Sequence, residues 1–373
     1  MRNKVFAYCR KERLISPGDT VVCAVSGGID SMVLLDLLCA LRPTLGITVR
    51  AAHFNHCLRG QESDRDEAFV HAVCQARGVA LAAGSGDVAA RAAETGESIE
   101  EAARKLRYAF FDTLGETVAT AHNADDNLET VLLNLVRGTS LAGLCGIAPR
   151  RGRIIRPLLC LTRAEIEQYA QENGLAHVED STNAQDACVR NRLRHHVVPL
   201  LKAENPTLSE TALRACALVR EDDRYLQAAA QALLDAAALP CGCSCRALRE
   251  APAALRTRAL RLLLQRIRAP KLSASHILAA ERLVFSSDPS ATSSLPGGWT
   301  MRREYDALRL PGGTRTVKRL LIDRKVPAHE RGLVPVIADS AGVLAVYPFG
   351  VNLDRLAAAG ERAIIITIEK EDM

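Results

Sequence analysis

The first two hundred residues alternate continuous apolar runs with stretches in which apolar residues recur at helical spacing. The apolar runs cover residues 20–25, 47–54, 79–83 and 117–121. Because they lack polar alternation, they are typical of strands buried on both faces, as in parallel sheets. The stretches between them carry helix signals, such as the capping box from Ser98 to Glu101. This alternation predicts an α/β domain with a doubly wound, mostly parallel sheet.

Length and a change in residue pattern predict three domains. A chain of 373 residues is too long for one ordinary core. We expect the α/β domain over residues 1–203 and a helical domain over 204–290, where Ala, Leu and Arg dominate. Four further apolar runs follow a turn-rich cluster and predict a small α+β domain over 291–373.

Composition argues against membrane and secreted classes. The hydrophobic fraction of 48% and the charged fraction of 24% are typical of soluble globular proteins. The sequence has no apolar run of about eighteen residues, and its start lacks the apolar segment of a signal peptide. Several of the 12 cysteines lie inside apolar runs, which favours buried, reduced thiols. We therefore expect a cytoplasmic protein with no membrane contact.

The segment SGGIDS, residues 26–31, follows the first predicted strand and precedes a predicted helix. In α/β sheets this position binds ligands, because free N–H groups at the start of the helix favour anions. The adjacent glycines let the backbone approach phosphate oxygens, and Ser26 and Ser31 add hydroxyl donors. Asp30 would repel phosphate unless a cation bridges the two, which predicts Mg²⁺ coordination. The alternative is a plain strand–helix turn in which Asp30 or a serine caps the helix.

Two further segments place polar side chains at the same edge of the predicted sheet. HFNHCLRG follows the second strand and brings His53 and His56 into reach of phosphates or a base. Helical periodicity predicts that Arg104, in SIEEAARKLRY, is half-buried and reaches this edge. An ordinary structural histidine and an ordinary surface arginine are the alternatives.

A pair of carboxylates follows the fourth predicted strand, in the segment AHNADDNLET. Asp126 and Glu129 are three residues apart at the start of a helix and therefore share one face. Such a pair can hold an ammonium group or a metal ion. The alternative is that both acids only complement the helix dipole.

SGGxDS after the first strand resembles the PP-loop of ATP pyrophosphatases, with the adenine nucleotide alpha hydrolase-like fold. The sequence also is similar to the tRNA(Ile)-lysidine synthetase family over nearly its whole length. The motifs that carry this likeness occur in the order and approximate spacing of that family: SGGIDS, HFNHCLRG, SIEEAARKLRY, AHNADDNLET, VRGTSLAGLCGI, RPLL and EDSTN with VRNRLRHHVVP.

The resemblance implies a reaction on a tRNA(Ile) with a CAU anticodon. ATP adenylates the C2 oxygen of the wobble cytidine, and free L-lysine then displaces AMP to form lysidine, after release of pyrophosphate. The implied co-substrate is ATP with Mg²⁺. Matching the motifs assigns Asp126 and Glu129 to lysine, and Arg104 to the phosphates or the adenylate. The ATP-binding residues that we expect are Ser26, Gly27, Gly28, Ile29, Asp30, Ser31 and His53.

One residue departs from the family pattern. The family usually has two histidines before its pair of aspartates, whereas this chain has His122 followed by Asn123. Any role of the second histidine side chain is therefore in doubt, while His122 keeps its place.

Two basic regions are candidate tRNA-binding surfaces. Arg190, Arg192 and Arg194 either guide the anticodon loop or form a solvated helix face. Residues 300–335 hold nine Lys/Arg and four Asp/Glu, an excess that equals the net charge of +5. Within them, we expect the tRNA body to contact Lys318, Arg319, Arg324 and Lys325. Because aromatic residues are only 4% of the chain, phosphate and shape contacts fit better than extensive stacking.

The residues alone are also compatible with two other functions. A tRNA thiolation enzyme shares the loop, but usually needs a catalytic thiol or an iron–sulfur site, and this chain has no CxxC. Its cysteine cluster CGCSC, residues 241–245, is either incidental or a metal site. A non-catalytic tRNA-binding paralogue is a further alternative, although such a protein would be expected to lose SGGIDS or the acidic pair. Oligomeric state is open, with a homodimer among the alternatives.

Overall fold

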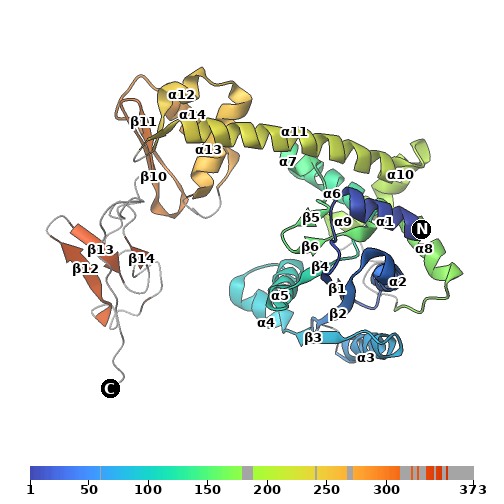
Figure 1. The fold of residues 1–373 in the computed structure, drawn as a ribbon. Helices are drawn as coiled ribbons and strands as arrows, with labels where there is room; N and C mark the ends of the chain where they lie inside the picture. Colours follow the sequence, from blue (N-terminus) through green and yellow to red (C-terminus); the bar gives the residue numbers. More distant parts are fainter. Residues whose placement is uncertain are drawn as a thin grey trace. The chain divides into compact units, whose positions relative to one another are not determined.

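The structure is a computed structural model that describes residues 1–58, 60–178, 188–239, 242–266, 272–310, 321, 326, 333–339, 342–346 and 350–351. The chain forms two compact units, Met1–Asp223 and Arg224–Met373 (Figure 1). None of the described helices combines the length and the apolar composition that crossing a bilayer requires. The domain boundaries expected at residues 203 and 290 stay a prediction.

A six-stranded sheet forms the centre of the first unit, in the order β3-β2-β1-β4-β6-β5. All neighbouring strands run parallel except β5, which is antiparallel to β6. The order reverses at β1, whose neighbours are β2 and β4, and such a reversal is where doubly wound sheets bind ligands. The predicted α/β class is therefore confirmed. The strands are β1 (Thr20–Ala24), β2 (Thr48–Asn55), β3 (Leu81–Ser85), β4 (Thr117–Ala119), β5 (Arg150–Arg151) and β6 (Ile154–Ile155).

Helices connect these strands and continue beyond them. In the amino-terminal half of the unit they are α1 (Arg2–Lys11), α2 (Ile29–Leu45), α3 (Gln61–Ala76), α4 (Val88–Thr95), α5 (Ile99–Thr113) and α6 (Ala124–Arg137). They are followed by α7 (Leu141–Leu144), the short 3₁₀ helix η1 (Pro157–Cys160), α8 (Arg163–Glu172), α9 (Val189–Arg192), the π-helical segment η3 (Leu193–Val197), α10 (Val198–Glu204) and α11 (Leu208–Ala236).

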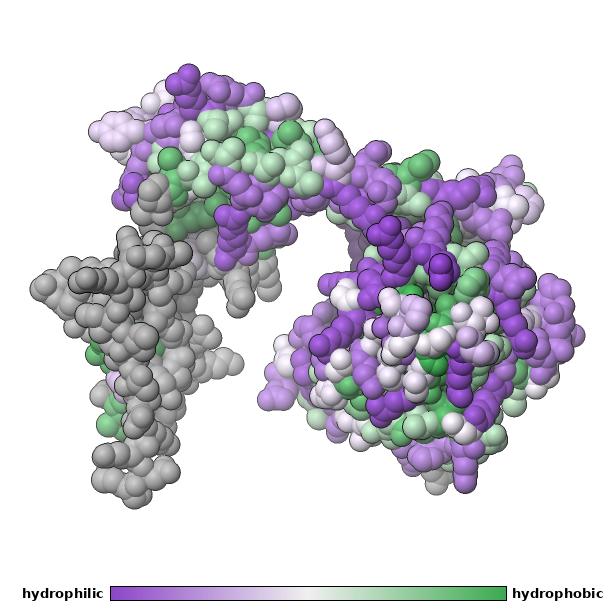
Figure 2. Space-filling model, viewed as in Figure 1, coloured by the Kyte–Doolittle hydropathy of each residue, from purple (hydrophilic) through white to green (hydrophobic). Residues whose placement is uncertain are grey.

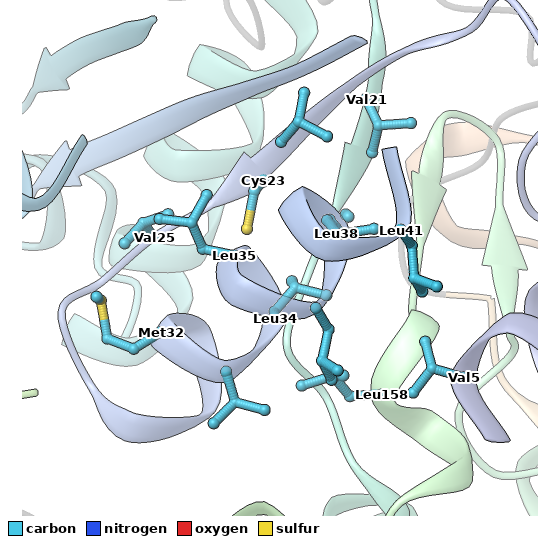
Figure 3. Packing of buried hydrophobic residues seen from close by; sticks show 14 of the residues in the cluster. Val5, Val21, Cys23, Val25, Met32, Leu34, Leu35, Leu38, Leu41 and Leu158 are labelled. Carbon is cyan, nitrogen blue, oxygen red and sulfur yellow. The ribbon is translucent and has the colours of Figure 1, made fainter. Parts of the chain in front are cut away.

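Helix α2 is apolar on almost all sides, and this makes it the centre of the core. Figure 3 shows its leucines, including Leu34 and Leu38, among Val21 of β1, Val5 of α1 and Leu158 of η1. Each fully buried leucine of this kind stabilises the fold by roughly 1.5–3 kcal/mol. The packing therefore fixes α2, and with it the SGGIDS loop, against the central strand.

The loop is shorter than the sequence pattern predicts. We expected the strand to end at Val25 and the helix to start near Ser31, but β1 ends at Ala24 and α2 begins at Ile29. The helix starts earlier because the N–H groups of Ser31 and Met32 both donate to the carbonyl of Gly28, at 3.0 and 3.1 Å. Asp30 and Ser31 consequently lie inside the first turn of α2.

The second unit packs helices against a five-stranded antiparallel sheet in the order β7-β8-β11-β10-β9. Two short strands, β7 and β8, lie in the region predicted to be helical, because the chain around Cys243 pairs with β11. The strands are β7 (Ala238–Leu239), β8 (Gly242–Ser244), β9 (Thr292–Ser294), β10 (Thr300–Glu304) and β11 (Ala307–Arg309). The helices are the end of α11, α12 (Cys245–Glu250), α13 (Ala253–Arg266), α14 (Ala274–Phe285) and η4 (Pro296–Gly298).

A further antiparallel sheet follows, with β12 (Val336–Asp339), β13 (Gly342–Val346) and β14 (Gly350–Val351). Hydrophilic residues cover much of the visible face of both units (Figure 2).

Cys243 and Cys245 are fully buried in the core of the second unit, and burial raises the pKa of the Cys243 thiol to about 12. These two thiols pack as core residues, while Cys241 lies outside the described residues.

Candidate active site

A crevice of ≈ 600 Å³ opens at the carboxyl ends of β1, β2 and β4. The loop after β1 contributes Ser26 and Gly28, and the first turn of α2 contributes Asp30 and Ser31. The other side chains that line it include His53, Asn55 and His56 from the end of β2, His122 after β4, Arg107 and Phe111 of α5, Asp126 of α6 and Arg190 of α9. We predicted from the sequence that SGGIDS, HFNHCLRG and AHNADDNLET meet at one edge of the sheet, and residues of all three segments line this crevice.

Internal hydrogen bonds hold the SGGIDS loop in one shape. Gly27 has a φ of +93°, a conformation that residues with a Cβ rarely adopt. The hydroxyl of Ser31 accepts from the N–H of Ser26 at 3.1 Å and donates to the carbonyl of Gly28 at 2.8 Å. The N-cap of α2 is Gly28, so no side chain caps this helix. Such an uncapped helix start favours an anion.

Asp30 joins the loop to two other segments. Its Oδ1 accepts a hydrogen bond from Asn123 Nδ2 at 3.0 Å, and its Oδ2 pairs with the guanidinium of Arg163. Burial raises the pKa of Asp30, and Arg163 opposes that shift. The nearby carboxylate of Asp126 raises the pKa further.

The carboxylates at Asp30 can bind Mg²⁺ only if phosphates of a bound substrate complete the coordination of the ion. Mg²⁺ in nucleotide sites is usually held by one or two carboxylates together with substrate phosphates and water. Asp30 and Asp126 are near enough to interact electrostatically and can supply such carboxylates. In the part of the chain that the structure describes, no group of three or more acidic, His or Cys side chains forms a complete metal site. The residues thus fit an ion that is shared with phosphates.

Asn123 forms the cap of α6. Its Oδ1 accepts from the N–H groups of Asp125 and Asp126, both at 3.0 Å, and Asp126 Oδ2 accepts from the N–H of Asn123 at 3.0 Å. One oxygen of Asp126 thus completes the capping box of α6. The other oxygen of Asp126 is turned to the arginines of α9 and η3.

Asp126 and Glu129 share one face of α6, as their spacing predicts, and two arginines bind that face. Arg190 Nε lies 2.7 Å from Glu129 Oε2, and Arg190 Nη2 lies 3.1 Å from Asp126 Oδ1. Arg194 Nε lies 2.5 Å from Glu129 Oε1, and its Nη2 lies 2.8 Å from Oε2. Glu129 is only 3% exposed. The structure therefore brings two residues expected at the tRNA together with the two expected at lysine.

Two more predicted residues, Arg192 and His53, are described by the structure. Arg192 is exposed on α9. Lys318, Arg319, Arg324 and Lys325 lie outside the described residues. His53 is buried, and its Nδ1 lies 2.8 Å from the carbonyl oxygen of Val25, the residue after β1, so the backbone there holds one edge of a ring that lines the crevice.

Arg104 is placed differently from our expectation. We expected it to be half-buried at the sheet edge, but it is exposed, and its guanidinium lies 5.3 Å from the centre of the Tyr108 ring. Arg107, three residues further along α5, lines the crevice instead. Sequence reasoning missed Arg107, although its spacing of four from Phe111 places both on one helix face.

His122 is held as a neutral imidazole. Its Nδ1 lies 3.0 Å from Thr120 Oγ1. Burial lowers the pKa of His122 to about 3, and the neighbouring guanidiniums of Arg156, Arg190, Arg107 and Arg104 contribute to the shift. At neutral pH this side chain therefore offers the crevice an uncharged ring.

Comparison with known proteins agrees with this geometry. Residues 4–201 match the family model described as the PP-loop domain, so the fold and the loop define a PP-loop enzyme. Residues 244–309 match the TilS substrate binding domain, and residues 299–367 match the TilS substrate C-terminal domain. The chain belongs to the tRNA(Ile)-lysidine synthase family.

Three curated relatives support this assignment, and each is named tRNA(Ile)-lysidine synthase. The protein of Geobacillus kaustophilus is 38% identical over 82% of this chain and 69% of its own length. That of Geobacter sulfurreducens is 38% identical over 81% of this chain and 67% of its own length. That of Bacteroides thetaiotaomicron is 43% identical over 57% of this chain, and the match spans only 50% of that relative. The predicted family and the predicted enzyme class, an ATP-dependent tRNA-modifying ligase, are confirmed.

Proposed function

We propose that this chain ligates L-lysine to C2 of the wobble cytidine in CAU-anticodon tRNA(Ile), with conversion of ATP to AMP and pyrophosphate. The observation that carries the proposal is the shared crevice, which is lined by the SGGIDS loop and by Asp126 of the acidic pair. A nucleotide on the loop and an amine at the acids would therefore meet over one small space. Membership of the family supports the same reaction.

The loop suits the triphosphate of ATP. The uncapped start of α2 provides backbone N–H groups and the positive end of the helix dipole, and Ser26 and Ser31 add hydroxyls at the crevice wall. Asp30 is the residue that would hold Mg²⁺, which when bound neutralises charge on the phosphates. Arg107 supplies a guanidinium at the crevice and takes the place expected for Arg104 beside the departing pyrophosphate.

The acidic pair suits the lysine amine. An ammonium group is costly to bring into a buried site without a counter-charge, and it must lose a proton before the nitrogen can attack. Asp126 and Glu129 provide the counter-charge, and a carboxylate in this position can accept the proton. Because Arg190 and Arg194 already contact both acids, the ammonium must share their lone pairs or displace one guanidinium.

The tRNA would be bound beyond the crevice as well. The matches to the two TilS substrate domains support an RNA surface in the second unit, where Lys318, Arg319, Arg324 and Lys325 stay candidates. The cytoplasmic location and a homodimeric state stay predictions.

The test is lysine incorporation by matched variants. Purified protein is incubated with CAU-anticodon tRNA(Ile), ATP and labelled lysine, and RNA-bound label is counted. Asp126→Asn should lose incorporation while ATP still binds at the SGGIDS loop, because Asp30 and the loop itself are unchanged. Glu94→Gln, which changes one exposed acid of α4, is the control and should act like the parent chain. Incorporation by Asp126→Asn at the parent rate would overturn the role of the acidic pair.

A further inference from the structure

Helix α5 presents two different faces to two different cavities. Arg107 and Phe111, four residues apart, line the catalytic crevice. Arg104, Lys105 and Tyr108 lie on another face and line a separate open groove of ≈ 690 Å³. The opposite wall of that groove is the β5–β6 hairpin, with Arg151, Gly152, Arg153 and Ile154. We call this cavity the α5–hairpin groove.

The groove is rich in arginines that have no acidic partner. Across the described ranges of the chain, no ion pair is found for Arg104, Arg151 or Arg153. Two acids, Glu101 and Asp112, also line the groove, against the four cations Arg104, Lys105, Arg151 and Arg153. Glu101 Oε1 lies 3.5 Å from Lys105 Nζ, which is itself bound to Glu97 at 2.5 Å, and Asp112 is exposed. Positive charge therefore exceeds the negative charge available to neutralise it.

The positive charge continues through the wall between the two cavities. Arg107 and Arg156 also form no ion pair within the residues that the structure describes. Arg156 is 5% exposed, and its Nε has no hydrogen-bond partner there. Burial lowers the pKa of both guanidiniums, and each has another arginine as a like-charged neighbour. Uncompensated cations at this density favour a bound polyanion.

We propose that the α5–hairpin groove binds phosphates of the RNA strand on one side of the target cytidine. This inference rests on the proposed function, because it assumes that the cytidine enters the catalytic crevice. A helix with its side chains is about 10–12 Å across, so a strand leaving the crevice reaches the groove within a few nucleotides. Exposed arginines on a helix face and on a hairpin suit a chain of phosphates, and phosphate contacts position RNA without reading its sequence.

Arg151 and Arg153 are the residues to change. Both are exposed and make no ion pair with the described residues, so their removal should leave the fold intact. The double variant Arg151→Ala/Arg153→Ala is compared with Arg10→Ala/Lys11→Ala, which removes the same charge from exposed positions of α1. Arg151→Lys/Arg153→Lys keeps the charge and serves as the second control.

The measurement is the dissociation constant of a fluorescent CAU anticodon stem–loop between about 50 and 200 mM salt. Two lost phosphate contacts should reduce the slope of log K against log salt by about 1.4–1.8. The groove variant should show this loss, and both controls should keep the parent slope. ATP binding should be the same in all four proteins.

The outcomes separate the two proposals. If the groove variant keeps the parent slope, or if the slope of the α1 variant falls by as much, the groove does not bind phosphates of the RNA strand. In that case lysidine formation by the parent chain would leave the proposed function standing. If the parent chain itself forms no lysidine, the proposed function fails, whatever the slopes are. An RNA crosslink from 4-thiouridine next to the target cytidine to residues 104–108 or 151–154 would support the groove directly.

Discussion

Asn123 Nδ2 donates a hydrogen bond to Asp30 Oδ1 at 3.0 Å, and so joins the start of α6 to the SGGIDS loop. The carbonyl oxygen of the same amide caps α6, with both N–H contacts at 3.0 Å. An asparagine can do both because it carries two donors and an acceptor with two lone pairs. The position that departs from the usual family pattern therefore connects the loop expected to bind ATP with the helix of the acidic pair.

Replacing Asn123 separates its two functions. Asn123→Ala should lose the cap and lower the free energy of unfolding by about 1 kcal/mol. Asn123→Asp should keep the cap but place a second carboxylate against Asp30, so it should lose more lysidine formation than the alanine variant. Denaturant unfolding and initial rates measure the two effects. If the aspartate variant were as active as the alanine variant, the hydrogen bond between Asn123 and Asp30 would not contribute to lysidine formation.

Glu129 should matter for stability as well as for activity. Glu129→Gln leaves Arg190 and Arg194 without their main counter-charge, but these side chains are 30% and 38% exposed, so water compensates in part. We expect a loss of about 1–2 kcal/mol, less than for a fully buried pair. Adding Arg194→Gln should recover part of the stability and none of the lysine incorporation. Recovery of activity in the double variant would argue against a direct role for Glu129.

His122 should make the fold sensitive to acid. Its pKa is about 3 in the folded chain and near 6.5 when exposed, so between these values the unfolded state binds one more proton. Stability should therefore fall as the pH falls through this window, by up to about 1.4 kcal/mol per pH unit from this group. His122→Asn should flatten the pH dependence of the unfolding midpoint. An unchanged slope would mean that the ring becomes charged in the folded state.

The cysteines should differ sharply in reactivity. Every cysteine among the described residues is a free thiol, and Cys57 is exposed. Cys9 is buried and Cys160 is partly buried, and burial raises the pKa of each thiol to about 12, so both stay protonated near pH 8. Iodoacetamide followed by peptide mass spectrometry should label Cys57 in the native protein and reach the other two only after unfolding. Rapid native labelling of Cys9 would contradict the packing of α1.

Some of the site was predictable because it depends on local spacing. The order of apolar runs predicts which loops meet at one sheet edge, and the spacing of Asp126 and Glu129 predicts a shared helix face. Their arginine partners were not predictable, because Arg190 comes some sixty residues later and its approach depends on how α9 packs on α6. The choice between Arg104 and Arg107 depends on the rotation of α5 about its axis. Packing of Phe111 sets that rotation, and the motif does not contain it.

The most direct test of the central claim is the stoichiometry of one reaction. The parent chain is mixed with CAU-anticodon tRNA(Ile), ATP and lysine, and the AMP released is compared with the lysine that becomes bound to RNA. The account predicts equal amounts of AMP and RNA-bound lysine, with no bound lysine when ATP is omitted. Release of ADP in place of AMP, or ATP cleavage without lysine transfer, would contradict it.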